Sequence, residues 1–118
     1  MQRFQELTVW QRSHALVLRV YRLAGQFPAD ERYGLTSQLR RATLSVPTNI
    51  AEGSKRRGRA EYARFLNIAE GSLAETEYLL IVCRDLGYAS DSVLNPILEE
   101  TAQIAKMLNA LRTKVERV

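Results

Sequence analysis

Hydrophobic residues recur along the chain at alternating steps of three and four, and no segment shows the strict alternation of a β-strand. This spacing places apolar side chains along one face of an α-helix. It predicts helices over residues 9–26, 34–52, 59–86 and 91–116. The stripe of the first predicted helix comprises Val9, Leu16, Val20, Leu23 and Phe27, and that of the last comprises Leu94, Ile97, Ile104, Leu108, Leu111 and Val115.

Glycine and proline mark the ends of these segments. Phe27 precedes Pro28 and ends the first helix, because a residue before proline is pushed out of helical backbone geometry. Gly53 and Gly87 follow the second and third stripes, and glycine is the common residue after a helix. Pro47 lies inside the second segment, so we expect a kink between residues 43 and 47.

Four amphipathic helices with short connections predict an all-α fold, an up-down-up-down four-helix bundle. The chain has 118 residues and contains no internal repeat or linker. We therefore expect one domain over residues 1–118.

The third predicted helix is more apolar than one buried seam requires. Three leucines follow each other at seven-residue spacing beside its main stripe, and the run 79–83 is apolar all round. This excess of apolar residues is typical of a large bundle core or of a subunit interface. We favour an interface in a homo-oligomer. The residues expected there are Leu66, Leu73, Leu80, Ile81 and Val82.

Composition excludes several classes of protein. No apolar run approaches the roughly 20 residues of a membrane-spanning helix, and the N-terminus lacks the pattern of a secretory signal, so we expect a cytoplasmic protein without membrane contact. The single cysteine, Cys83, excludes an internal disulfide framework. Together with the single histidine, His14, it also excludes the usual zinc sites. We expect no metal and no cofactor.

No motif indicates catalysis. The stretch from Gly53 to Gly58 has the glycine spacing of a phosphate-binding loop, but Arg59 and Ala60 stand where that loop requires lysine and a hydroxyl residue. No serine or cysteine nucleophile has a histidine partner that the sequence can assign. We expect a protein that is not an enzyme.

Positive charge is concentrated in the middle of the chain. The formal net charge is +4, yet residues 32–64 carry eight basic and two acidic side chains, which gives +6. A run of this kind is typical of phosphate-backbone contacts, of a solvated loop or of a surface that binds an acidic protein partner. The candidate nucleic-acid-binding residues are Arg40, Arg41, Lys55, Arg56, Arg57, Arg59 and Arg64.

A second set of polar residues shares one face of the second predicted helix. Arg41, Ser45, Asn49 and Glu52 lie three or four residues apart, and Ser72 and Glu75 of the third helix are their expected partners. Such residues are typical of a partly buried hydrogen-bond network or of a ligand site. We also expect Glu75 to pair with an arginine, because an unpaired buried charge is costly.

These residues belong to a longer pattern that resembles the bacterial four helix bundle protein family, whose members are encoded in intervening sequences of large-subunit ribosomal RNA genes. The resemblance covers nearly the whole chain. It includes Phe4-x-Glu6-Leu7-x-Val9-Trp10, Tyr33-Gly34-Leu35-Thr36-x-Gln38-Leu39-Arg40, Ser45-x-Pro47-x-Asn49-Ile-Ala-Glu52-Gly53 and Phe65-Leu66-Asn67-Ile-Ala-x-Gly-Ser72-Leu-x-Glu75.

The resemblance implies a small bundle that assembles into rings of five. A related protein, the accessory variability determinant of diversity-generating retroelements, is a basic pentamer of the same fold that binds nucleic acid and a reverse transcriptase. We therefore expect this chain to bind RNA or DNA through the phosphate backbone. The alternative is a structural or adaptor protein whose oligomer binds another protein.

Overall fold

The computed structural model describes residues 3–117, and these form four α-helices. They are α1 (Thr8–Ala24), α2 (Leu35–Ser54), α3 (Arg59–Asp85) and α4 (Asp91–Glu116), with short 3₁₀ turns at Phe4–Glu6 and Ala29–Glu31. Every predicted helix is present, and no end differs from its prediction by more than two residues. The ends of α1 and α2 each shift by two residues. At the end of α1 the chain tightens into hydrogen bonds from the Gln26 N–H to the Leu23 carbonyl and from the Phe27 N–H to the Ala24 carbonyl.

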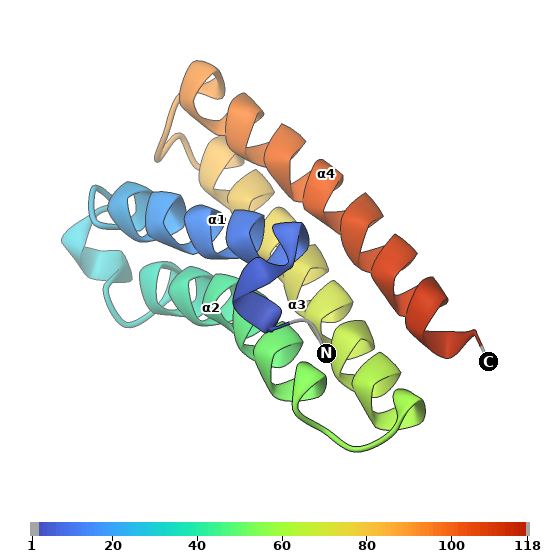
Figure 1. Ribbon diagram of the computed structural model, residues 1–118. Coiled ribbons are helices and arrows are strands. Elements are labelled where there is room, and N and C mark those ends of the chain that lie inside the picture. The colour runs from blue at the N-terminus through green and yellow to red at the C-terminus, as the bar shows by residue number, and fades with distance from the viewer. Residues whose placement is uncertain (1–2, 118) are drawn as a thin grey trace.

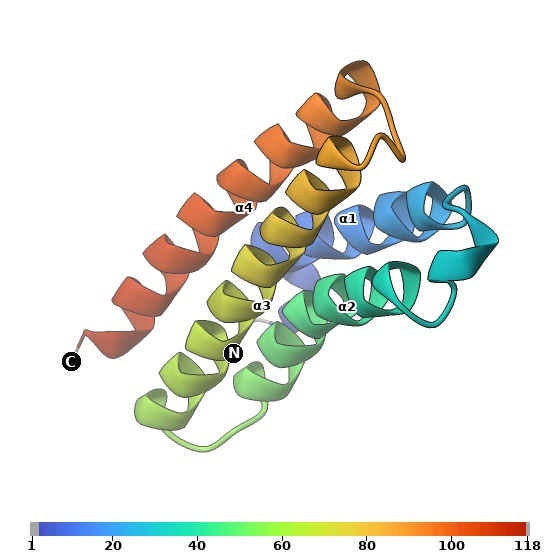
Figure 2. The ribbon, with the colours of Figure 1, turned by 180° about the vertical axis from the view of Figure 1, so that it is seen from behind.

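Consecutive helices pack side by side and antiparallel, and α4 closes the arrangement against α1 (Figures 1 and 2). The predicted all-α fold and four-helix bundle are therefore confirmed. The packing between α1 and α4 is the least extensive of the four. An ion pair supports it, because Arg12 of α1 donates from Nε to a carboxylate oxygen of Glu100 on α4 at 2.9 Å.

Proline in the middle of α2 divides this helix into two parts. The helix is continuous through Pro47, but proline has no N–H for the carbonyl of Thr43 and crowds the preceding turn. Figures 1 and 2 show α2 turning at its middle, so that the first part follows α1 and the second follows α3. The expected kink is present.

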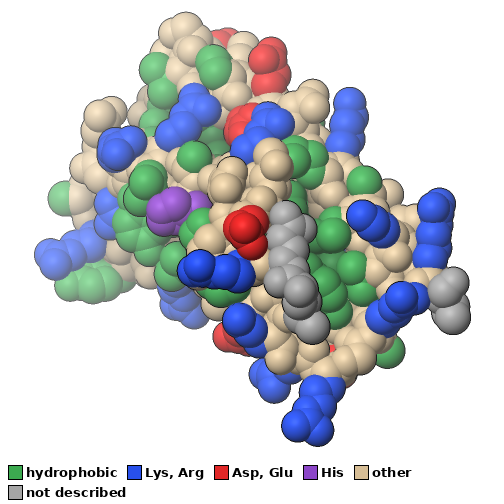
Figure 3. Space-filling view, viewed as in Figure 1, with side chains coloured by type: hydrophobic (Ala, Val, Ile, Leu, Met, Phe, Trp, Pro, Cys, Tyr) green, Lys and Arg blue, Asp and Glu red, His purple; other side chains and the backbone are tan. Residues whose placement is uncertain are grey.

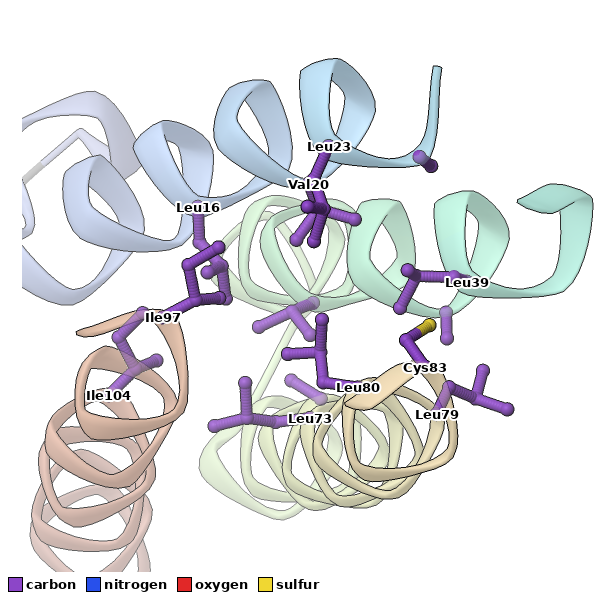
Figure 4. Close-up of a cluster of buried hydrophobic side chains, with 14 of the residues drawn as sticks. Leu16, Val20, Leu23, Leu39, Leu73, Leu79, Leu80, Cys83, Ile97 and Ile104 are labelled. Carbon is purple, nitrogen blue, oxygen red and sulfur yellow. The ribbon is translucent and has the colours of Figure 1, made fainter. Parts of the chain in front are cut away.

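Side chains from all four helices meet in one core (Figure 4). Cys83 lies inside it, and burial raises the pKa of its thiol to about 11. This thiol is a packing residue, because the reactive thiolate form is absent at neutral pH.

The leucines expected at a subunit interface belong to this core instead. Leu66, Leu73 and Leu80 expose 2% or less of their surface within the single chain. The prediction is wrong for these three residues because α3 packs against both α2 and α4, and two neighbours require apolar side chains over a wider arc than one seam. Ile81 and Val82 are half-buried, and their place at an interface stays a prediction.

Two glycines with positive φ set the limits of α3. Gly58 (φ 83°) precedes the helix and Gly87 (φ 75°) follows it. Tyr88 donates its N–H to the Cys83 carbonyl and Gly87 donates to that of Arg84, which is the bonding of a glycine-terminated helix. Gly87 thus ends α3 as expected.

A third glycine lets α2 approach α3 closely. A Cβ atom added to Gly53 would lie 2.7 Å from the Cβ of Phe65 and 3.1 Å from a ring carbon of Tyr62. Atoms at such a distance clash, so only glycine allows this crossing. The expectation that Gly53 ends α2 is wrong, because the helix continues to Ser54. Gly53 instead determines how the end of α2 sits on α3.

We predict that Gly53→Ala destabilises the fold by about 1–3 kcal/mol, because the added methyl group overpacks the crossing. Gly71→Ala is the matched control, since nothing lies within 4 Å of its added Cβ. It should stabilise the exposed helix by up to about 1 kcal/mol through helix propensity. Urea unfolding followed by circular dichroism measures both free energies. A change of the same sign and size in the free energy of unfolding of both variants would contradict the close approach of α2 to α3 at Gly53.

Candidate nucleic-acid interface

The loop between α2 and α3 carries a dense group of basic residues. We define the basic corner as Lys55, Arg56, Arg57, Arg59 and Arg64, all of which are exposed. Figure 3 shows Lys and Arg side chains projecting around the end of the molecule where this loop lies in Figure 1. The structure therefore brings together five of the seven basic residues predicted to contact nucleic acid.

These five differ in the charge that they can offer to a ligand. Among the described residues, the side chains of Lys55, Arg56 and Arg57 have no hydrogen bond or ion pair with another residue. Arg59 donates to the backbone carbonyl of Arg117. Arg64 pairs with Glu61, Nε to Oε2 at 2.6 Å. Most of the available positive charge thus comes from residues 55–57.

Phe65 lies beneath two of these arginines. The guanidinium carbon of Arg56 is 5.0 Å from the ring centre, and that of Arg64 is 4.7 Å from it. Phe65 itself is 7% exposed, so its ring is fixed by packing. Cation–π contacts of this length hold a guanidinium in place.

The first turn of α3 adds a favourable field for anions. No side chain caps the start of the helix at Gly58, so the first N–H groups of α3 are not satisfied by a capping side chain. Unpaired N–H groups and the helix dipole both favour negative charge at this point. An anion at the basic corner would meet arginine side chains and a helix N-terminus together.

The other two candidate residues lie outside the basic corner, and their contact with nucleic acid stays a prediction. Arg40 donates to the Tyr21 carbonyl at 2.9 Å and lies over the Tyr21 ring, which ties α2 to α1. Arg41 is exposed in the first part of α2. It lies about 20 Å from the loop along the helix, given the rise per residue of an α-helix. Proximity in sequence to the basic run did not bring these residues near it in space.

Two further arginines approach the basic corner that the sequence did not indicate. Arg3 lines a hollow with Lys55, Arg56 and Arg57. Arg112 of α4 lines another hollow with Arg59 and Arg64, although it is already paired with Glu70 and Glu116. Both come from the ends of the chain, and only the folded arrangement places them here.

The polar residues of α2 and α3 form a network of their own. The hydroxyls of Ser45 and Ser72 are 2.8 Å apart, and the Asn49 amide donates to the Ser45 hydroxyl and carbonyl. These three side chains are half-buried. The expected hydrogen-bond network forms among these three of its six expected members, and the contact between Ser45 and Ser72 links the two helices beside the turn at Pro47.

Beyond the serines, α2 and α3 diverge to leave a groove of about 600 Å³ that Arg41 and Glu75 line. Glu75 is exposed and accepts a hydrogen bond from Gln38 at 3.4 Å. Within residues 3–117 it makes no ion pair, so the expected arginine partner is wrong. The reason is solvent exposure, which removes the need for a partner. Glu52 is also exposed and lies outside the network.

The chemistry available in the described part of the chain is ionic and hydrogen-bonding. Residues 3–117 contain no group of three or more His, Cys, Asp or Glu side chains placed to hold a metal ion. None of the helices formed by these residues is both long and apolar enough to cross a membrane. The basic corner is the place where guanidinium groups and helix N–H groups can act on one anion.

The fold is similar to a solved structure. A protein of unknown function from the S23 ribosomal protein family of Bacteroides thetaiotaomicron VPI-5482 superposes with a TM-score of 0.80. Sequence identity is 24%, and the match covers 89% of this chain and 98% of that one. A likeness at this identity supports the bundle fold alone. None of the curated proteins compared with the chain matches it.

The family comparison covers most of the chain. The model of the 23S rRNA-intervening sequence protein family matches residues 5–110, a range that includes all the polar residues of α2 and α3 and the whole basic corner. This agrees with the resemblance carried by the sequence patterns around Pro47 and Gly53. The chain therefore belongs to the 23S rRNA-intervening sequence protein family.

Proposed function

We propose that this chain is a non-catalytic bundle that binds RNA or DNA through the phosphate backbone at the basic corner. The observation that carries the proposal is the group of exposed, unpaired side chains of Lys55, Arg56 and Arg57 at the uncapped start of α3. Each of these features favours a phosphate, and they converge on one place.

The same geometry favours contact with the backbone over reading of bases. Stacking on single-stranded bases needs exposed aromatic rings beside the basic residues. Tyr62 and Phe65 are the aromatic residues of α3 near the loop, and both are at least half-buried. Arginine forks suit phosphate oxygens at any sequence. We therefore expect weak discrimination among sequences.

We predict that the double variant Arg56→Gln, Arg57→Gln binds duplex RNA or DNA at least about tenfold more weakly at low salt, because two phosphate contacts are lost. The negative slope of log affinity against log salt concentration should become shallower by about 2. Gel retardation or fluorescence anisotropy over a salt series measures both quantities.

The matched control removes the same charge at another place. Arg19 of α1 and Arg32, which precedes α2, are exposed and lie away from the loop, so Arg19→Gln, Arg32→Gln should leave the slope unchanged. Equal slopes for the two double variants, or no binding of either nucleic acid by the unaltered chain at low salt, would overturn the proposal.

Self-association is the second part of the proposal. The α1 face (Trp10, His14, Leu18, Tyr21) is exposed or half-buried along its length, and Leu18 is 43% exposed. The α3 face (Ile68, Glu75, Tyr78, Val82) leaves Tyr78 64% exposed.

The two faces are separate surfaces, since α1 and α3 occupy diagonal positions in the bundle. Arg22 continues the α1 face and Glu75 belongs to the α3 face, so the two are complementary in charge. Head-to-tail contacts between unlike faces give a ring where the rotation between subunits closes, and the resemblance to a pentameric relative implies such a ring. A ring would present several basic corners together, and weak contacts would then add by avidity.

We predict that Leu18→Glu and Tyr78→Glu each yield monomers, because each places a charge in one apolar face. Light scattering should give 13.4 kDa for each variant and a multiple of that mass for the unaltered chain. A mixture of the two variants should form dimers, since each keeps the face that the other has lost. A mass of 13.4 kDa for the unaltered chain, or a mixture that stays monomeric, would contradict head-to-tail assembly.

A further inference from the structure

Two arginines from different elements share one aromatic ring at the basic corner. Arg56 comes from the loop after α2 and Arg64 from the second turn of α3. Because both guanidinium carbons lie within 5.0 Å of the Phe65 ring centre, they are less than about 10 Å apart. A guanidinium on a ring keeps its N–H groups free for an oxygen ligand. The pair can therefore act on one anionic group, or on two neighbouring ones.

An anion already pairs with one of these two arginines in the structure. Arg64 reaches the Glu61 carboxylate through Nε at 2.6 Å and through Nη2 at 3.5 Å. This hydrogen bond lowers the pKa of Glu61, and the positive charge of Arg56 lowers it further. A carboxylate presents two oxygens to a guanidinium fork as a phosphate does. Glu61 thus occupies the place that an external phosphate would take.

We propose that Arg56 and Arg64, held by Phe65, form a phosphate clamp, and that the Glu61 carboxylate occupies its Arg64 side as an internal competitor until a phosphate displaces it. The identification of a nucleic-acid backbone as the source of that phosphate rests on the proposed function above. Arg56 and Arg64 bind the phosphate, and Phe65 positions their guanidinium groups. Glu61 lowers the affinity of the clamp for phosphate.

This arrangement discriminates between an isolated phosphate and a chain of phosphates. A free phosphate ion must displace Glu61 with no other contact to help it. A nucleic acid first engages Lys55 and Arg57, to which no carboxylate of residues 3–117 is bonded. It so brings its next phosphate to the clamp at high local concentration. The competitor therefore raises selectivity for a polymer over the free ion.

The first test removes the competitor. Glu61→Gln should bind a short RNA duplex at least about threefold more tightly than the unaltered chain, given the usual strength of an exposed ion pair. Glu77→Gln is the matched control, because Glu77 is an exposed glutamate on the same helix and its loss changes the net charge equally. Equal affinities of the two variants would overturn the role of Glu61.

The second test removes the ring without removing charge. Phe65→Leu should bind the duplex about threefold more weakly, since two cation–π contacts are lost, and its salt slope should stay unchanged. Phe65→Tyr keeps a ring and should keep the affinity. Phe27→Leu replaces another buried aromatic residue far from the loop and controls for a general loss of packing. Equal effects of Phe65→Leu and Phe27→Leu would overturn the positioning role.

A spectroscopic readout reports the clamp without nucleic acid. The δ protons of Arg56 and Arg64 should resonate upfield in the unaltered chain and in Phe65→Tyr, because they lie over a ring, and this shift should vanish in Phe65→Leu. Titration with sodium phosphate should perturb both arginine Nε–H signals in Glu61→Gln at lower concentration than in the unaltered chain. Arginine signals that do not respond to the ring or to phosphate would overturn the clamp.

The two proposals fail in different ways. If the chain binds no duplex at low salt, the proposed function fails, and the sodium phosphate titration still decides whether the clamp exists. If the duplex binds but the Glu61 and Phe65 variants match their controls, the clamp is overturned and backbone binding by the basic corner stands.

Discussion

The backbone of α2 lies directly against Phe65 at Gly53, where an added Cβ would approach within 2.7 Å, and the basic corner depends on this contact. The crossing directs the loop after α2 over the Phe65 ring, so that Arg56 from the loop meets Arg64 from α3. A larger residue at position 53 would push the two helices apart and separate the arginines. One glycine therefore links the packing of the bundle to the charge at its surface.

The helices could be predicted from the sequence because amphipathic spacing, glycine and proline act locally. The contact between Ser45 and Ser72 could be predicted for a related reason, since both residues lie at regular positions on adjacent helices. The role of Leu66, Leu73 and Leu80 could not, because an apolar excess does not show whether a second helix or a second chain covers it. Arg3 was missed because only tertiary packing brings it to the loop, and Arg40 was misplaced because it turns toward α1.

Polar residues of α2 and α3 divide between structural and binding roles. Ser45, Asn49 and Ser72 hold the helices together beside Pro47, and Gly53 permits their close crossing. The basic corner is connected to this framework but has few bonds of its own. The unpaired side chains of Lys55, Arg56 and Arg57 repel one another electrostatically. A bound polyanion would neutralise this repulsion. The match to the 23S rRNA-intervening sequence protein family covers both the framework and the basic corner and leaves the bound partner to experiment.

The central claim is that residues 55–64 form the surface that meets a phosphate backbone. The most direct measurement is the change in backbone amide chemical shifts when a short RNA duplex is added at low salt. We predict that the largest changes occur over residues 55–64 and at Arg3, with little change over residues 91–104 of α4. Changes that spare residues 55–64, or that spread evenly over the bundle, would contradict the account.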